Sequence, residues 1–258
     1  MPELPVPGAL DAAVHSYLLA VTTRGEHHRI GPFAVGLDRA SANPFRNYAV
    51  PDDGAEPGPG DVAALVALFE RHDRTPRLEY VPGRAPAVEP ALLAAGFAVE
   101  RLAPVLACAR DGVRDLPPPP GFDLVEAVGD DDLLAVAEVQ HEAYGEPVPP
   151  GPADVERLRR TVRSGGVVVL AREAATGDGA GAGLCTAPAA GVRELAAVAV
   201  RGRFRRRGIA GAVTARLAML AQARGAATVW LEPAGEAEQR IYERAGFAVV
   251  GSKIAIAR

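Results

Sequence analysis

Apolar residues in the second half of the chain fall into short runs, separated by stretches in which they recur at helical spacing. After Gly208, residues Ile209, Val213, Leu217 and Leu220 line one face of a helix that ends near residue 225. The same reasoning predicts helices at 130–144 and 152–164, a glycine-rich turn at 176–183, and strands at 122–127, 167–172, 183–187, 192–200 and 227–231. This alternation indicates an α/β fold with a mixed sheet.

The first half carries a shorter version of this pattern. We expect strands at 46–50 and 77–81, a strand or hairpin at 97–109, a helix at 88–95, and a helix capped by Asp61. Two segments also repeat each other: Arg77-Leu78-Glu79 precedes AGFAV at 95–99, and Trp230-Leu231-Glu232 precedes AGFAV at 245–249. Each copy is typical of a strand, a loop, a short helix closed by glycine, and a strand. The repeat predicts two related α/β domains in tandem.

Four consecutive prolines, at 117–120, mark the expected boundary between the domains. Proline can neither continue a helix nor donate a backbone hydrogen bond to a sheet, and a run of prolines favours a stiff extended spacer. We therefore expect a first domain at 1–116, a proline-rich linker at 117–120 and a second domain at 121–258.

Composition narrows the class of protein. Apolar residues make up 48% and charged residues 23% of the 258 residues, as in globular proteins. No apolar run reaches the ~18 residues of a membrane span, and the segment 1–13 lacks the pattern of a signal peptide. Cys108 and Cys185 have no metal-type spacing, so we expect no metal site and a cytoplasmic protein. The net charge of −4 argues against nucleic acid as a general partner.

An arginine-rich loop, 201–211, joins the strand at 192–200 to the helix after Gly208. A strand-to-helix turn directs several backbone N–H groups at one point, and the helix dipole favours an anion there. Glycine lets the backbone approach closely, and arginine forms bidentate contacts to phosphate. The expected ligand is a pyrophosphate. The alternatives are a solvated basic loop or a patch that binds nucleic acid.

The loop and its surroundings resemble the GNAT superfamily of N-acetyltransferases. The family pattern is Gln or Arg, two residues, Gly, one residue, then Gly or Ala; here it is Arg205, Gly208 and Ala210 directly after an apolar strand. The later segment Ile241-Tyr242-Glu243-Arg244-Ala245-Gly246-Phe247 strengthens the likeness. The resemblance covers about residue 122 to the C-terminus. Together with the internal repeat, it implies two GNAT-like (acyl-CoA N-acyltransferase) domains.

The resemblance also implies acetyl-CoA as co-substrate. Its pantetheine arm would pair with the strand and its pyrophosphate would bind the loop. The implied cofactor-binding residues are Val198, Ala199, Val200, Arg205, Arg206, Arg207, Gly208, Ile209, Ala210 and Gly211.

Tyr242 matches the tyrosine that protonates the departing CoA thiolate in many family members. Its alternative role is to pack against the cofactor. Glu194, on the strand at 192–200, is the candidate general base, with Glu142 and Tyr144 as further acceptor-site candidates. Many relatives carry Asn seven residues before the tyrosine, where this chain has Gly235. A side-chain contact to the cofactor is therefore expected to be missing.

The first half has no comparable loop, because 51–60 contains three acidic residues, three prolines and no arginine. We expect a degenerate GNAT-like copy there, beside a second domain that acetylates a primary amine of a small molecule by direct attack. The alternative is an acyl-CoA-binding sensor or scaffold without catalysis.

Overall fold

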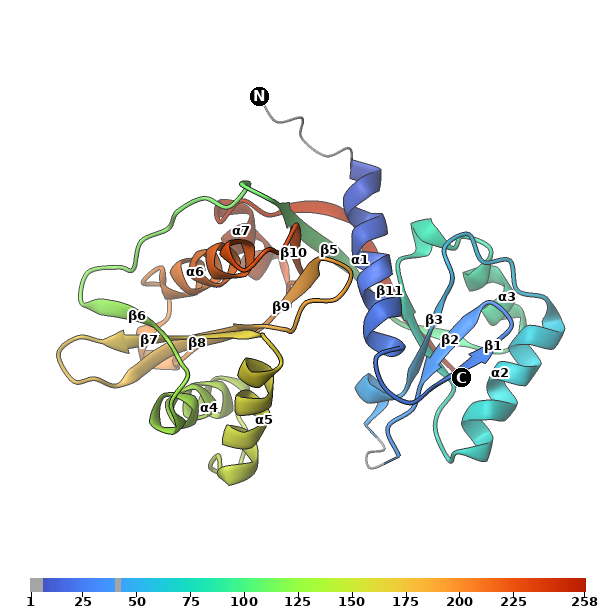
Figure 1. The fold of residues 1–258 in the computed structure, drawn as a ribbon, viewed down its shortest axis with the longest axis horizontal. Helices are drawn as coiled ribbons and strands as arrows, with labels where there is room; N and C mark the ends of the chain where they lie inside the picture. The colour runs from blue at the N-terminus through green and yellow to red at the C-terminus, as the bar shows by residue number, and fades with distance from the viewer. Residues whose placement is uncertain (1–6, 40–42) are drawn as a thin grey trace. The chain divides into compact units, whose positions relative to one another are not determined.

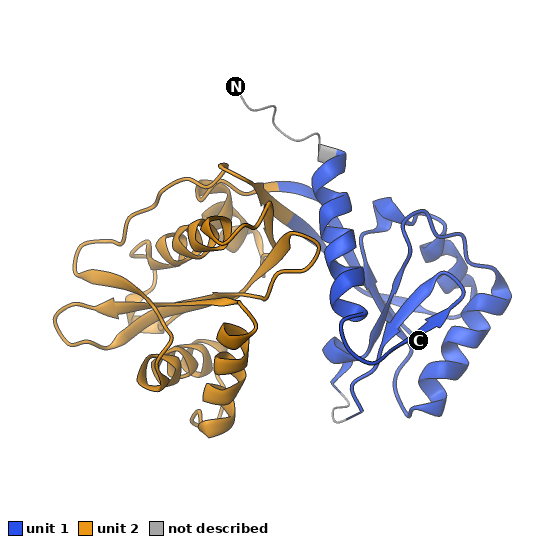
Figure 2. Ribbon diagram, in the orientation of Figure 1, with its two compact units in different colours: residues 1–105, 249–258 blue, residues 106–248 orange. Residues whose placement is uncertain are grey.

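The computed structural model describes residues 7–39 and 43–258, and the chain forms two compact units (Figure 2). Unit 1 comprises 1–105 and 249–258, and unit 2 comprises 106–248. Residues 1–6 lie outside the described residues. They belong to the segment 1–13, for which the sequence predicts no signal peptide. No helix of the described part is long and apolar enough to cross a membrane.

The two units differ from the expected domains, which were separated at 117–120. Strand β5 (Ala98–Ala109) starts in unit 1, and its Leu106–Ala109 end pairs with β10 (Thr228–Leu231) in unit 2. Conversely, the end of β11 (Ala248–Ala257) pairs with β4 (Arg77–Tyr80) in unit 1. The last strand of each repeat is therefore shared between the units. The end of β5, from the first half of the chain, pairs in unit 2, and the end of β11, from the second half, pairs in unit 1.

Unit 2 contains a mixed sheet in the order β5-β10-β9-β8-β7-β6. Strands β6 to β9 pair antiparallel, whereas β9 and β10 run parallel. Their bounds are β6 Phe122–Glu126, β7 Val167–Glu173, β8 Gly179–Cys185 and β9 Val192–Val200. The mixed α/β fold predicted from the sequence is confirmed.

Helices cover both faces of this sheet (Figure 1). Helices α4 (Asp130–Tyr144) and α5 (Pro152–Arg163) pack on one face, and α6 (Ile209–Ala223) packs on the other. A short helix, α7 (Glu236–Arg244), follows β10 and contacts α6. Two apolar cores result, one on each side of the sheet.

Strand β8 begins at Gly179, so the expected glycine-rich turn at 176–183 is too long and the strand expected at 183–187 starts too late. The glycines serve packing. A Cβ at Gly181 would lie 2.5 Å from Ile209 Cγ2, and one at Gly183 would lie 2.9 Å from Leu217 Cδ1. Helix α6 therefore rests directly on the strand backbone.

Unit 1 has the strand order β1-β2-β3-β4-β11-β5. Helix α1 packs on β2, β3 and β4, whereas α2 contacts β1 and α3. The element bounds are α1 Pro7–Thr22, β1 His27–Ile30, β2 Phe33–Gly36, β3 Tyr48–Pro51, α2 Pro59–Arg71 and α3 Val88–Ala94. Helix α1 and strands β1 and β2 were not predicted from the sequence. The N-cap of α2 is Gly58 rather than the expected Asp61, whose carboxylate accepts a hydrogen bond from the Gly58 N–H at 2.9 Å.

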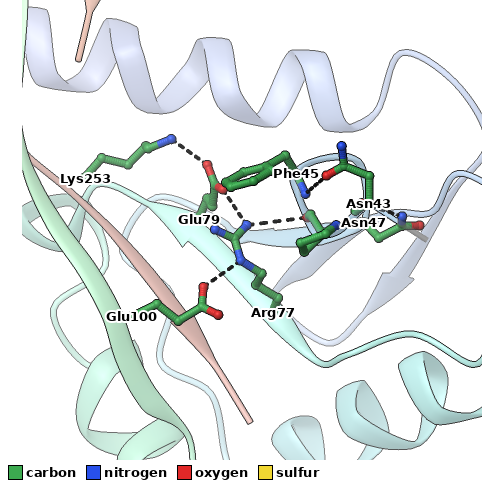
Figure 3. Close-up of polar contacts among 8 residues, drawn as sticks. Asn43, Phe45, Asn47, Arg77, Glu79, Glu100 and Lys253 are labelled. Atoms are coloured by element: carbon green, nitrogen blue, oxygen red, sulfur yellow. Dashed lines mark hydrogen bonds and ion pairs between the residues drawn. The ribbon is translucent and has the colours of Figure 1, made fainter. Parts of the chain in front are cut away.

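A buried set of charges joins β4 to β11 in unit 1 (Figure 3). Glu79 lies between two cations: it pairs with Arg77 and accepts a hydrogen bond from Lys253 Nζ at 2.5 Å. Arg77 Nε also donates to Glu100 at 2.8 Å, and its guanidinium lies over the Phe45 ring. The charges neutralise one another, which offsets the cost of burying them.

Candidate functional site

A pocket of about 1030 Å³ lies in unit 2, beside the second half of β9. Its walls come from the chain after β5, the end of α4, β9 with the following loop, the first turn of α6, and the chain from the end of β10 through α7. The lining residues are Leu116, Pro117, Ala143, Tyr144, Ala197, Val198, Ala199, Val200, Phe204, Arg205, Arg206, Gly208, Ile209, Ala210, Gly211, Glu232, Ala234, Ala237, Glu238, Ile241, Tyr242 and Arg244.

The pocket begins where the ladder between β9 and β10 ends. Val192–Glu194 lie opposite Thr228–Trp230 in parallel register, and the pocket lies against β9 from Ala197 onward. This edge of β9 presents backbone N–H and C=O groups to the pocket, and an extended ligand can pair with a strand edge of this kind.

A bulge in β9 precedes this edge. Ala199 pairs with Ala182, but Ala196 pairs with Leu184, so the register slips by one residue, and Ala197 has a φ of +54°. Leu195 and Val198 consequently pack against the same core, on the α6 side, although they are three residues apart. The bulge thus fixes which side chains of β9 face α6 along the pocket.

The loop after β9 ends in a left-handed turn. Arg206 has a φ of +62°, and Gly208, the N-cap of α6, has a φ of +90°. Glycine offers no capping side chain, so the first-turn amides of α6, at Ile209, Ala210 and Gly211, remain available to a ligand. They line the pocket at the positive end of the helix dipole, which favours an anion.

Nine of the ten expected cofactor-binding residues line the pocket, and Arg207 is the exception. Arg205 lies between two elements: its Nε donates to the Val200 carbonyl at 3.2 Å and its Nη2 to the Ala143 carbonyl at 3.5 Å. The Arg207 guanidinium lies 5.6 Å from the centre of the Phe204 ring, and its Nη2 donates to the Arg203 carbonyl. An aromatic contact therefore holds Arg207 outside the lining.

Tyr242, on α7, lines the pocket with 8% of its surface exposed. Burial, with smaller effects of Glu238 and Tyr144, raises the pKa of Tyr242 to about 12. The phenol is therefore protonated at neutral pH and has a proton to donate. Tyr144, at the end of α4, is a second phenol in the lining.

The carboxylates of the lining are Glu232 and Glu238, not Glu194. Glu194 lies in the ladder opposite Trp230, and its N–H donates to Thr186 Oγ1. Glu142 forms an ion pair with Arg201. Glu232 was not among the residues predicted for the site, although it belongs to the repeated Trp230-Leu231-Glu232 and directly follows β10.

Gly235 is the N-cap of α7. It does not line the pocket. Among the described residues, no group of three or more His, Cys, Asp or Glu side chains is arranged to hold a metal ion, and both cysteines are buried.

Comparisons with known proteins place this fold in a wider group. The acetyltransferase (GNAT) family model matches residues 133–247, which include strands β7 to β10, the arginine-rich loop and α7. No curated protein has a sequence similar enough to this chain to count as a match.

Several solved structures share the fold. A GCN5-related N-acetyltransferase from Kribbella flavida is similar with a TM-score of 0.80 and 23% identity, over 96% of this chain and 95% of that one. One from Sphaerobacter thermophilus has a TM-score of 0.65 and 21% identity, over 98% and 93%. A tandem GNAT protein from the clavulanic acid biosynthesis pathway has a TM-score of 0.60 and 16% identity, over 88% and 78%. The predicted GNAT fold is confirmed, and residues 133–247 match the model of the acetyltransferase (GNAT) family.

Proposed function

We propose that unit 2 transfers an acetyl group from acetyl-CoA to a primary amine of a small molecule. One observation carries the proposal: the edge of β9, the first-turn amides of α6 and the Tyr242 side chain line a single pocket. The three features match the three parts of the co-substrate, which are an amide-bearing arm, a pyrophosphate and a thioester.

The binding groups follow from this match. The pantetheine amides would pair with backbone groups of Val198 and Val200, as an added strand does. The pyrophosphate would accept hydrogen bonds from the amides of 209–211, and Arg205 and Arg206 would supply positive charge. Arg244 also lines the pocket and adds a third guanidinium.

The reaction requires three proton transfers. The neutral amine attacks the thioester carbonyl carbon, a C–N bond forms, and the C–S bond breaks to release the CoA thiolate. Tyr242 would donate the proton that the thiolate takes up, and the proton that the new amide nitrogen loses would restore the phenol. A base must first remove a proton from the ammonium form of the acceptor. We assign this role to Glu232, which lines the pocket, in preference to Glu194.

One acyl-CoA per chain is the proposed stoichiometry, because the loop after β3 in unit 1 is acidic and its carboxylates are paired. After β3, Asp52 and Asp53 pair with Arg29 and Arg84. His15 of α1 is buried there, with its Nε2 2.9 Å from the Pro51 carbonyl oxygen. These contacts support a degenerate first copy.

Calorimetric titration with acetyl-CoA tests the proposal, using wild type and a variant with Arg205 and Arg206 changed to alanine. We expect one micromolar site per wild-type chain, and binding at least about tenfold weaker in the variant. Arg203 and Arg207 changed to alanine provide the matched control, since neither lines the pocket. Absence of binding to wild type would refute the proposal, and two sites per chain would refute the degenerate copy.

A further inference from the structure

The bulge in β9 has a side-chain partner outside the pocket. Gln140, on α4, is 3% exposed, and its Nε2 donates to the Ala197 carbonyl at 3.3 Å. Arg157, on α5, donates from Nη2 to Gln140 Oε1 at 3.4 Å. Because arginine has only donors, this contact fixes the orientation of the amide and directs its NH₂ group to Ala197.

The bulge conformation needs such a partner. Ala197 has a φ of +54°, in a region that is unfavourable for every residue with a side chain. The slip in register between β9 and β8 places two residues of β9 opposite Gly183. A Cβ at Gly183 would lie 3.2 Å from Val198 Cγ2, so the bulged Val198 fills the space over this glycine. A regular strand would turn Val198 toward α4 instead.

We infer that Gln140 is a positioning residue, which holds Ala197 in the bulge and so presents the edge of β9 to acyl-CoA. This rests on the proposed function for the identity of the ligand. The hydrogen bond from Gln140 acts on the backbone of the strand. Without it, Ala197 could leave its positive φ, and the side chains of β9 would alternate between the two faces as in a regular strand. The N–H and C=O groups that face the pocket would then belong to other residues.

Gln140→Glu tests the inference with little change in volume. The carboxylate keeps the contact with Arg157 but has no donor for the Ala197 carbonyl, which it repels. Gln222→Glu is the matched control. Gln222 lies on α6 in the same unit, its Nε2 donates to the strand carbonyl of Ala109 at 2.7 Å, and it does not line the pocket.

Two measurements separate positioning from a general effect on stability. Calorimetry with acetyl-CoA should give a dissociation constant about tenfold higher for Gln140→Glu, and one within about twofold of wild type for Gln222→Glu. Backbone amide exchange, measured by NMR without ligand, should be about tenfold faster at 196–200 in Gln140→Glu only. Because this second measurement needs no ligand, it tests the hold on the bulge even if wild type fails to bind acetyl-CoA.

A rescue variant adds a positive test. Glycine adopts a φ of +54° at little cost, so Ala197→Gly in the Gln140→Glu background should recover most of the lost affinity. The inference is overturned if Gln140→Glu binds acetyl-CoA like wild type, or if exchange at 196–200 matches that of the Gln222→Glu control. It is equally overturned if Ala197→Gly weakens binding further.

Discussion

Replacing Lys253 by methionine tests how the buried charges hold unit 1 together. Methionine keeps the apolar stem of the side chain but removes the ammonium group that Glu79 contacts. The side chains of Lys253 and Glu79 are 12% and 9% exposed, so water cannot replace the lost partner. Glu79 keeps its contact with Arg77.

The structure sets the size of the effect. Removing one partner of a buried ion pair costs about 3–5 kcal/mol when the other is left alone. Because Arg77 still neutralises Glu79, we expect about half of this, a loss of about 2 kcal/mol in the free energy of unfolding. In a unit of this size, such a loss lowers the melting temperature by about 8 °C.

Arg29→Met is the matched control for Lys253→Met. Arg29 also pairs with a carboxylate at 2.5 Å in unit 1, but its side chain and that of Asp52 are 48% and 40% exposed. Exposed pairs of this kind contribute less than about 1 kcal/mol. Urea unfolding and calorimetry of both variants at pH 7 would give the comparison. Equal losses for Lys253→Met and Arg29→Met would refute the reasoning.

The pH dependence of Lys253→Met follows from Glu79. Burial opposes ionisation of this carboxyl, but Lys253 and Arg77 outweigh it and lower the pKa. The stability from the ion pair is therefore present above the unfolded pKa of about 4.3, and is lost as the pH falls through the folded pKa. The difference between wild type and Lys253→Met should thus shrink below about pH 4.

Three further predictions concern the proposed site and unit 1. Tyr242→Phe should lower kcat about 100-fold and leave acetyl-CoA affinity nearly unchanged, because only the proton donor is lost. Unchanged turnover would exclude the general-acid role. If the protein is instead an acyl-CoA sensor, the variant should respond to the ligand as wild type does. Glu232→Gln should lower kcat/KM at neutral pH by at least about tenfold, whereas Glu194→Gln should have a small effect; the reverse order would return the base role to Glu194. Burial lowers the pKa of His15, so the unfolded state binds the proton more tightly and stability falls as pH drops below about 6.5. Urea unfolding from pH 5 to 7.5 should show this slope in wild type and a flatter one in His15→Gln.

The sequence identified most of unit 2, because its elements carry clear local signals. Helix α4 has the predicted bounds, Asp130–Tyr144: acidic residues occupy its first turn, and Gly145 ends it in a left-handed conformation. The arginine-rich loop at 201–211 was equally visible, since glycine and arginine at this spacing follow an apolar strand. In β8, by contrast, glycines required for packing under α6 resemble the glycines of a turn.

The bulge and the exchanged strands could not be predicted from the sequence. Residues 195–200 are all apolar, so they show no alternation from which a one-residue slip could be detected. The repeat around Glu79 and Glu232 predicts the elements but not their partners, because strand pairing depends on contacts distant in sequence. The place of Glu232 in the pocket lining could not be predicted for a related reason: the repeat gives it the same local pattern as Glu79, which is buried between two cations.

The exchange of strands β5 and β11 has a consequence for how the protein is made. Unit 1 needs residues 249–258, which carry Lys253 and pair with β4, yet these residues leave the ribosome more than a hundred residues after β4 does. The first half of the chain must therefore wait with an unpaired strand edge while unit 2 is synthesised. A fragment ending at the four prolines would keep that edge permanently, so the two halves of the gene should not yield two separately stable proteins.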